Sequence, residues 1–165
     1  DPGMAFGTGI HETTALCIDA LDRYLKPGTR VVDIGCGTGV LAISSVLLGA
    51  AGATAIDLDS NAVRITADNA RRNRVEDKLE VINGNLLDNV QGRFDIAVAN
   101  IIADVIIELT GYIGRFLKPK GLFIASGIIL DRLQDVAEAV KASGLELVES
   151  KTKGEWAVVV CQANA

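Results

Sequence analysis

The chain has 165 residues, of which 49% are hydrophobic and 22% charged, and its 21 acidic and 16 basic residues give a net charge of −5. This length fits one domain, and the composition excludes wholesale disorder. An acidic chain has no general attraction to phosphate backbones, so direct binding of nucleic acid is not expected. Residues 34–56 carry no charge but include five glycines, which favours buried strands and a helix over a membrane span.

The cysteine and histidine content predicts no metal site. Cys17, Cys36 and Cys161 are widely separated, no CxxC pair occurs, and His11 is the single histidine. Without a CxxC pair, a single histidine does not complete a zinc site of ordinary composition. The three thiols are expected in the core of a protein in the reducing cytoplasm.

Strands and helices are expected to alternate along the chain. Residues 1–14 are interpreted as a loop and residues 119–121 as a turn. The pattern predicts helices at 14–25, 40–48, 60–73, 104–116 and 131–142, and strands at 31–34, 53–57, 79–82, 94–99, 122–126, 145–150 and 156–161. This order indicates an α/β fold with a doubly wound, mostly parallel seven-stranded sheet, in which the C-terminal hairpin adds an antiparallel strand.

A glycine-rich segment follows the first strand. The residues GCGTG (35–39) open the next helix, and Asp57 ends the second strand, 22 residues after Gly35. Ligands of open parallel sheets bind beyond the carboxyl ends of the strands, where loop N–H groups and a helix N-terminus are expected to face them. A strand-end carboxylate accepts hydrogen bonds from ribose hydroxyls, which predicts an adenine-nucleoside cofactor. Val40 replaces the third glycine of GxGxxG, which disfavours NAD.

The segments VVDIGCGTG (31–39) and AIDLD (55–59) resemble the Rossmann-like methyltransferases that depend on S-adenosyl-L-methionine. The resemblance implies that cofactor and a glycine loop beside its methionine part. It places an acid near the methionine amino group, a second acid on the ribose, an apolar side chain beside adenine and an acceptor at the adenine amine. The implied loop positions are Gly35, Gly37 and Gly39. Asp33 would be the acid near the methionine amino group, and Asp57 the acid on the ribose. Leu58 would lie beside adenine, and Asn85 would accept from the adenine amine.

Two further segments, FGTGIHETT (6–14) and ANIIAD (99–104), resemble the family of ribosomal protein L-eleven methyltransferases. The resemblance covers nearly the whole chain. It implies methyl transfer to lysine side chains and the N-terminal amine of a large-subunit ribosomal protein. That family normally has an additional N-terminal domain for substrate docking, so residues 1–165 are expected to be the catalytic domain alone. The further cofactor-contacting positions that it implies are Phe6, Thr8, Thr14 and Asn100.

Asn100 and His11 are the candidate catalytic residues. Asn100 is suited to orienting an amine through its side-chain carbonyl, whereas His11 either acts as a base or holds its loop by hydrogen bonds. Residues 101–103 are aliphatic, without an aromatic ring to stack on a nucleobase, and are expected to form an apolar passage for a lysine side chain.

Other functions remain open at this stage. The same cofactor half would serve a methyltransferase acting on another protein or on a small-molecule amine. A module that binds S-adenosyl-L-methionine without transferring methyl is the alternative outside enzymes. A monomer is favoured.

Overall fold

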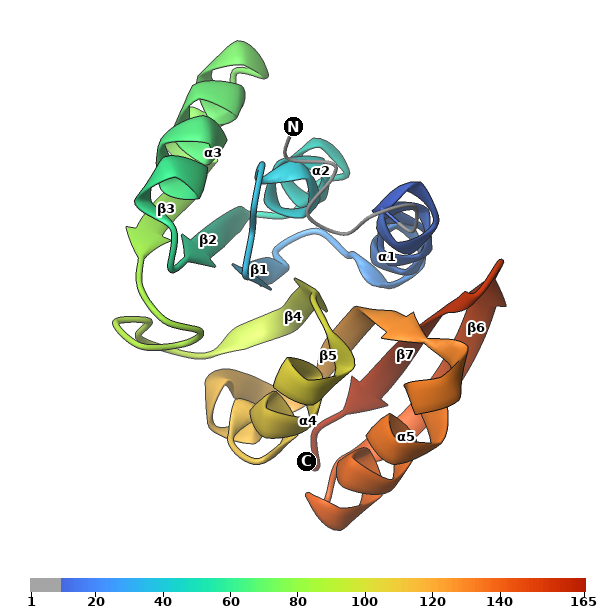
Figure 1. Ribbon diagram of the computed structural model, residues 1–165. Coiled ribbons are helices and arrows are strands. Elements are labelled where there is room, and N and C mark those ends of the chain that lie inside the picture. Colours follow the sequence, from blue (N-terminus) through green and yellow to red (C-terminus); the bar gives the residue numbers. More distant parts are fainter. Residues whose placement is uncertain (1–9) are drawn as a thin grey trace.

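The computed structural model describes residues 10–165, which form one seven-stranded sheet between two layers of helices (Figure 1). The strand order is β3-β2-β1-β4-β5-β7-β6. The neighbours from β3 to β5 pair in parallel, and β7 is antiparallel to both β5 and β6. The expected doubly wound sheet with a C-terminal hairpin is therefore confirmed. The strands are β1 (Arg30–Ile34), β2 (Gly52–Asp57), β3 (Leu79–Asn83), β4 (Phe94–Asn100), β5 (Leu117–Ile129), β6 (Glu146–Lys153) and β7 (Trp156–Gln162).

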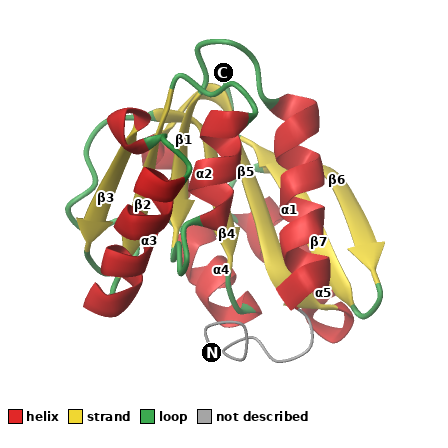
Figure 2. Ribbon diagram, turned by 90° about the horizontal axis from the view of Figure 1, so that it is seen from above, coloured by secondary structure: helices red, strands yellow, loops and turns green. Residues whose placement is uncertain are grey.

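Three helices cover one face of the sheet and two cover the other (Figures 1 and 2). The first group is α1 (Ile10–Tyr24), α2 (Val40–Leu47) and α3 (Ser60–Arg72), and the second is α4 (Ala103–Thr110) and α5 (Leu133–Ala142). Short 3-10 helices span Glu76–Lys78, Ile113–Phe116 and Leu130–Arg132. No helix within residues 10–165 is long and apolar enough to cross a membrane.

The two-residue period of the strands decides which side chains face α1 and α2. Ile96 and Val98 of β4 pack in the core cluster that contains residues of α1 and α2, whereas Ala97 and Ala99 pack in the cluster of α4 and α5. Asn100, the last residue of β4, therefore lies on the α1–α2 face. The same alternation places Asp33 of β1 and Asp57 of β2 on that face.

Helix α1 begins earlier than the sequence pattern indicated. It starts at Ile10, so the loop interpretation is wrong for residues 10–14, and His11 and Thr14 are helical. Thr13 is almost fully buried and its hydroxyl donates to Ile10 O over 3.2 Å. Glu12 in the first turn interacts favourably with the positive end of the helix dipole. Polar residues can thus start a helix when one of them packs on the sheet.

Smaller differences lie at element ends. Helix α3 begins at Ser60 as predicted, and its N-cap is Asp59, whose carboxylate accepts from Asn61 N. The expected turn at 119–121 is a bulge inside β5, where Lys120 has a φ of 62° and the register with β4 shifts. The last part of the helix expected at 104–116 and the first part of that at 131–142 are 3-10 helices.

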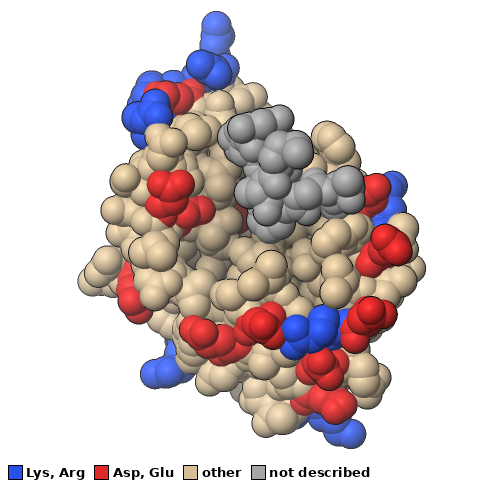
Figure 3. Space-filling view, viewed as in Figure 1, with Lys and Arg blue, Asp and Glu red and all other residues tan. Residues whose placement is uncertain are grey.

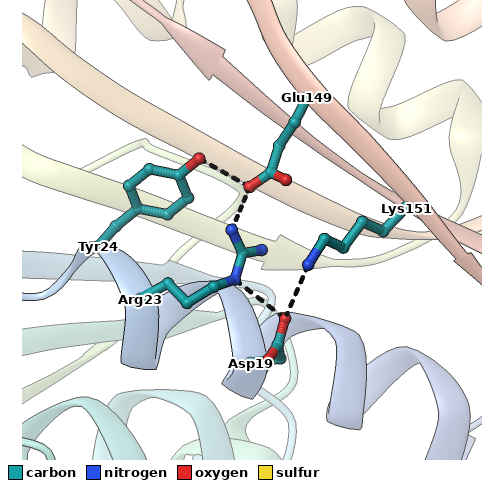
Figure 4. Close-up of polar contacts among 5 residues, drawn as sticks. All are labelled: Asp19, Arg23, Tyr24, Glu149 and Lys151. Atoms are coloured by element: carbon teal, nitrogen blue, oxygen red, sulfur yellow. Dashed lines mark hydrogen bonds and ion pairs between the residues drawn. The ribbon is translucent and has the colours of Figure 1, made fainter.

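A surface network joins α1 to the edge strand β6 (Figure 4). Glu149 Oε1 accepts from Arg23 Nη1 at 2.6 Å and from Tyr24 Oη at 2.7 Å. Asp19 pairs with Arg23 Nε at 3.1 Å and with Lys151 Nζ at 3.8 Å. These contacts fix the C-terminal half of α1, whose first turn lies at the other end of the sheet.

Candidate functional site

The glycine loop (residues 35–39) joins β1 to α2 and is closely packed at its two ends. A Cβ on Gly35 would lie 2.9 Å from Ile101 Cγ2, and one on Gly39 would lie 2.6 Å from Thr66 Cγ2. Both glycines also have positive φ, so a side chain there would be strained as well as crowded. Gly37 differs, because a Cβ there would have nothing within 4 Å. The middle of the loop therefore faces open space.

The first three N–H groups of the glycine loop are used inside the protein. Gly35 N and Cys36 N donate to Ile56 O over 2.8 and 3.0 Å, and Gly37 N donates to Asp57 Oδ2 over 2.9 Å. The expectation that these N–H groups face a ligand is wrong, because β2 ends beside the loop and its atoms Ile56 O and Asp57 Oδ2 accept their hydrogen bonds. A loop without these free N–H groups is not a phosphate cradle, and it suits a cofactor that has no phosphate.

Helix α3 holds the carbonyl groups of the same loop. Thr66 Oγ1 donates to Gly37 O, and Asn69 Nδ2 donates to Thr38 O, each over 2.9 Å. Sequence reasoning missed both side chains. Thr66 lies four residues before the buried Ala70, on one helix face, and a threonine at such a position is a signal for a buried hydrogen bond. The loop is thus held from two sides before any ligand binds.

Asp57 connects the end of β2 to the glycine loop. Its Oδ2 accepts from Gly37 N and its Oδ1 accepts from Asp59 N, both over 2.9 Å. Each carboxylate oxygen can accept a second hydrogen bond, so two adjacent hydroxyls can still bind. The geometry therefore allows Asp57 to hold a ribose while fixing the loop.

The residues after β2 and β3 surround this carboxylate. Leu58 is 68% exposed and offers an apolar surface at the end of β2. Asn83, which sequence reasoning missed, donates from Nδ2 to Asp57 O and Leu58 O, both at 3.0 Å. Asn85 is exposed in the turn after β3, where its backbone carbonyl accepts from Asp88 N. Asn83 thereby positions Leu58 and Asp57.

Asp33 is a buried carboxyl group beside the start of α2. It is 1% exposed, and its Oδ2 accepts from Ala42 N over 3.0 Å. Burial is the main cause that raises the pKa of Asp33 to about 7, the Ala42 N–H lowers it, and the charge of Asp57 raises it. A cationic group placed nearby would favour the charged form.

The segment after β4 is wedged between two glycines. Ile101 N donates to Ser126 O over 3.0 Å, and a Cβ on Gly127 would lie 2.3 Å from Ile101 O. Gly127 has a φ of 88°, so both its conformation and its contact require glycine. Ile101 is thereby held at the switch point between β1 and β4.

The expected apolar passage formed by residues 101–103 is not present. Ile102 is 59% exposed, but Ala103 is buried in the core and Ile101 packs against it. The chain turns into α4 at Ile102, which points consecutive side chains in different directions. Of these three residues Ile102 is exposed, Ile101 is half-buried and Ala103 is buried.

Two side-chain oxygens in the described part of the chain are buried without a hydrogen-bond partner. They are Asn100 Oδ1 at the end of β4 and Glu12 Oε2 in the first turn of α1. A buried acceptor left unpaired costs about 1–3 kcal/mol, more when charged. Sequence reasoning singled out Asn100 and missed Glu12, for which the sequence offered no signal beyond its place next to His11.

The other candidate residues differ in exposure. His11 is exposed and Thr14 is half-buried on α1, whereas Phe6 and Thr8 lie outside the described residues. Cys17, Cys36 and Cys161 are all buried, as expected, and burial raises the pKa of the Cys36 thiol to about 12. Within residues 10–165, no group of three or more His, Cys, Asp or Glu side chains could hold a metal ion.

The strand order, with the glycine loop at the switch point and Asp57 at the next strand end, defines a Rossmann-like α/β fold. The family described as "Ribosomal protein L11 methyltransferase (PrmA)" matches residues 1–164. The chain belongs to this family.

Relatives with the same description occur in two Alkaliphilus species. The protein of Alkaliphilus metalliredigens is 51% identical over 160 residues, covering 97% of this chain and 50% of that protein. The protein of Alkaliphilus oremlandii is 49% identical over 164 residues, covering 99% and 52%. The chain therefore spans about half the length of the curated relatives it matches.

Solved structures agree with this assignment. The crystal structure of ribosomal protein L11 methylase from Lactobacillus delbrueckii subsp. bulgaricus has a TM-score of 0.90 and 28% identity, covering 94% of this chain and 80% of that one. An RNA methyltransferase from Salinibacter ruber, solved with S-adenosyl-L-homocysteine, has a TM-score of 0.71 and 15% identity, covering 89% and 90%. The second likeness shows the shared fold alone.

Proposed function

We propose that this chain is the catalytic domain of a ribosomal protein L11 methyltransferase that methylates lysine side chains and the N-terminal amine of L11. Membership of the family supports the reaction class. The observation that carries the choice of an amine is the buried, unpartnered Asn100 Oδ1, an acceptor at the switch point that needs an N–H donor. Because L11 is a ribosomal protein, the proposal places the reaction in the cytoplasm, with a monomer as the working unit.

The residues at the carboxyl ends of β1 and β2 fit S-adenosyl-L-methionine. In our proposal Asp57 holds the ribose hydroxyls, Leu58 lies against adenine, and Asn85 accepts from the adenine amine. Asp33 acts on the methionine amino group through its charge, beside the open middle of the glycine loop at Gly37. The support is that the N–H groups of Gly35, Cys36 and Gly37 are already bonded, which suits a cofactor without phosphate.

The remaining candidate positions complete this proposed cofactor site. Gly35 and Gly39 let the loop approach its neighbours closely enough to frame the site. We assign Thr14 to the same site, and Phe6 and Thr8 to its cover. The exposed side chain of His11 favours a role outside the chemical step.

The chemistry proposed for this chain is mainly alignment. When bound, the cofactor supplies a methyl group that its positive sulfur has already activated. Asn100 Oδ1 accepts an N–H of the incoming amine and thereby directs the nitrogen lone pair. The buried surroundings of Asn100 favour the neutral amine over the ammonium ion, because removal from water raises the free energy of the charged form. Ile101, fixed between Gly35 and Gly127, keeps this side of the site rigid.

A methylation assay tests the proposal. The 165-residue chain and the full-length Alkaliphilus metalliredigens relative are incubated with labelled S-adenosyl-L-methionine and purified L11. We expect cofactor binding by both proteins in calorimetry, and methyl groups on lysine and N-terminal nitrogens of L11 by mass spectrometry. Binding of NAD instead of S-adenosyl-L-methionine would contradict the cofactor assignment. Methylation of small amines but not of L11 would contradict the substrate.

A further inference from the structure

Three large aliphatic side chains are exposed at the carboxyl edge of the sheet, close to Asn100. Ile102, two residues after Asn100, is 59% exposed, and Ile129 at the end of β5 is 42% exposed. Leu130 follows Ile129 and is exposed to the same extent. One exposed aliphatic side chain needs no explanation, but a group of them beside an unpartnered buried acceptor points to a ligand. Ile102, Ile129 and Leu130 are called the apolar patch below.

Contacts on both sides of the apolar patch hold its two segments together. On one side, a Cβ on Gly127 would lie 2.3 Å from Ile101 O, so β5 runs directly beside the chain that follows β4. On the other side, Arg132 Nη2 lies 2.8 Å from Asp104 Oδ1. Ile102 lies between Ile101 and Asp104 in the chain, and the other two members of the patch lie between Gly127 and Arg132. The three side chains therefore belong to one small surface.

Strand geometry turns this surface to the same side as Asn100. A backbone hydrogen bond continues the β4–β5 ladder past Asn100, and Ile102 is extended, with a φ of −69° and a ψ of 154°. Side chains two residues apart in an extended chain point to one face, so Ile102 shares the face of Asn100. Ile129 pairs with Trp156, which packs against the core cluster of α1 and α2, so Ile129 lies on that face too.

A lysine side chain matches this arrangement in length and polarity. Its five single bonds of about 1.5 Å span about 6 Å, and the two extended residues from Asn100 to Ile102 span at most about 7 Å. A lysine nitrogen that donates to Asn100 Oδ1 can therefore lay its four methylenes over the apolar patch. The charged end meets the polar atom, and the aliphatic part meets aliphatic side chains.

The charges around the apolar patch suit a cationic substrate. Asp131 is next to the patch in the chain, Glu155 O accepts from the last residue of the patch over 3.0 Å, and both carboxylates are exposed. Arg132 is paired with Asp104 at 2.8 Å and with Asp135 at 2.9 Å, which offsets its charge. On the face drawn in Figure 3, Asp and Glu side chains gather below a largely uncharged centre. A basic segment of a substrate protein is therefore attracted to this region.

We propose that the apolar patch binds the aliphatic part of the substrate lysine and thereby distinguishes lysine side chains from the N-terminal amine. This inference rests on the proposed function. The lysine nitrogen is held by Asn100 Oδ1, and its methylenes cover Ile102 and Ile129. An N-terminal amine is attached directly to the backbone and has no methylenes for the patch, so it relies on Asn100 alone. The surface for lysine is thus built from two strand ends, not from consecutive residues.

A substrate with both amines tests this distinction. The substrates are purified L11 and a synthetic peptide with one lysine and a free N-terminal amine. The two kinds of amine compete for the same enzyme, so the initial ratio of lysine to N-terminal methylation, read by mass spectrometry, reports the ratio of their kcat/KM values. Ile102→Ser and Ile129→Ser should each lower this ratio about fourfold, the effect of about one methylene left in water, and the double variant about tenfold. Methylation of the N-terminal amine itself should stay unchanged.

A shorter side chain gives a second readout. Ornithine in place of the peptide's lysine removes one methylene, which should lower the ratio about fourfold for the parent and less for the double variant. Leu147→Ser is the matched control and should behave as the parent, because Leu147 is 40% exposed but lies on the edge strand β6. Ratios that stay unchanged in the patch variants, or equal losses on both amines, would overturn the inference. A parent that methylates neither the peptide nor L11 would instead overturn the proposed function.

Discussion

The carboxyl edge of the sheet and the α1–β6 surface use polar side chains in opposite ways. At the edge, Asp33 is buried with one short backbone contact, and Asn100 Oδ1 has no partner among the described residues. On the surface, the half-buried Glu149 accepts from Arg23 and Tyr24 in a paired network. Burial without pairing is costly, whereas exposed ion pairs contribute little. The contrast separates buried groups with unused acceptors, which we propose serve a ligand, from surface groups that fasten the fold.

The largest effect is expected from Asp33→Asn in the absence of cofactor. The folded parent keeps its Asp33 proton up to about pH 7, whereas the unfolded chain loses it near pH 4. The unfolded state therefore binds fewer protons in this interval, and the parent's free energy of unfolding falls as pH rises, by at most about 4 kcal/mol. Asparagine keeps an acceptor for Ala42 N and does not titrate. Urea unfolding between pH 4.5 and 8 should show the variant gaining stability relative to the parent; parallel curves would contradict the burial argument.

Gly127→Ala should destabilise the fold by roughly 3 kcal/mol, because the new Cβ meets the Ile101 carbonyl and the φ of 88° disfavours a side chain. Gly154→Ala is the matched control. It has a φ of 61° but its nearest neighbour would be 3.9 Å away, so about 1 kcal/mol is expected. Urea denaturation compares the two. Equal losses would mean that conformation alone, not the contact with Ile101, requires glycine at 127.

Asp57→Ala should weaken binding of S-adenosyl-L-methionine by about 1–3 kcal/mol, because ribose hydroxyls and Gly37 N lose their acceptor. Asp59→Ala removes the nearby N-cap of α3 and should lower stability by about 1 kcal/mol without changing cofactor affinity. Calorimetry at equal protein concentration gives both affinities. Unchanged binding by Asp57→Ala would show that the ribose lies elsewhere.

The smallest effect is expected in the surface network. Hydrogen bonding from Tyr24, followed by that from Arg23, lowers the pKa of Glu149, so its stabilising contribution is present above the unfolded pKa and is lost in acid. Glu149→Gln should cost no more than about 1 kcal/mol near neutral pH, and less at high salt. Thermal unfolding at low and high salt measures this. A larger loss of stability that does not change with salt would contradict this, and would show that the network contributes as much as the buried groups at the carboxyl edge.

The sequence predicted the sheet, its hairpin and the glycine loop well because each depends on local patterns. Strand–helix alternation and the turn at Gly154 need no tertiary information. The start of α1 was missed because Thr13 is helical through its burial against the sheet, which composition does not reveal. The hydrogen bonds of Thr66 and Asn83 were missed for the same reason, since their partners are more than 20 residues away.

The sequence by itself determined the order of the elements and placed Asp33, Asp57 and Asn100 at strand ends, because strand period and glycine turns are properties of short segments. Only the tertiary structure decided which groups remain unpaired there. Strand β2 takes the N–H groups of the glycine loop, whereas Asn100 Oδ1 and Glu12 Oε2 are buried without a donor. Pairing depends on which distant segments come together, and this is why Glu12 emerges only in the folded molecule.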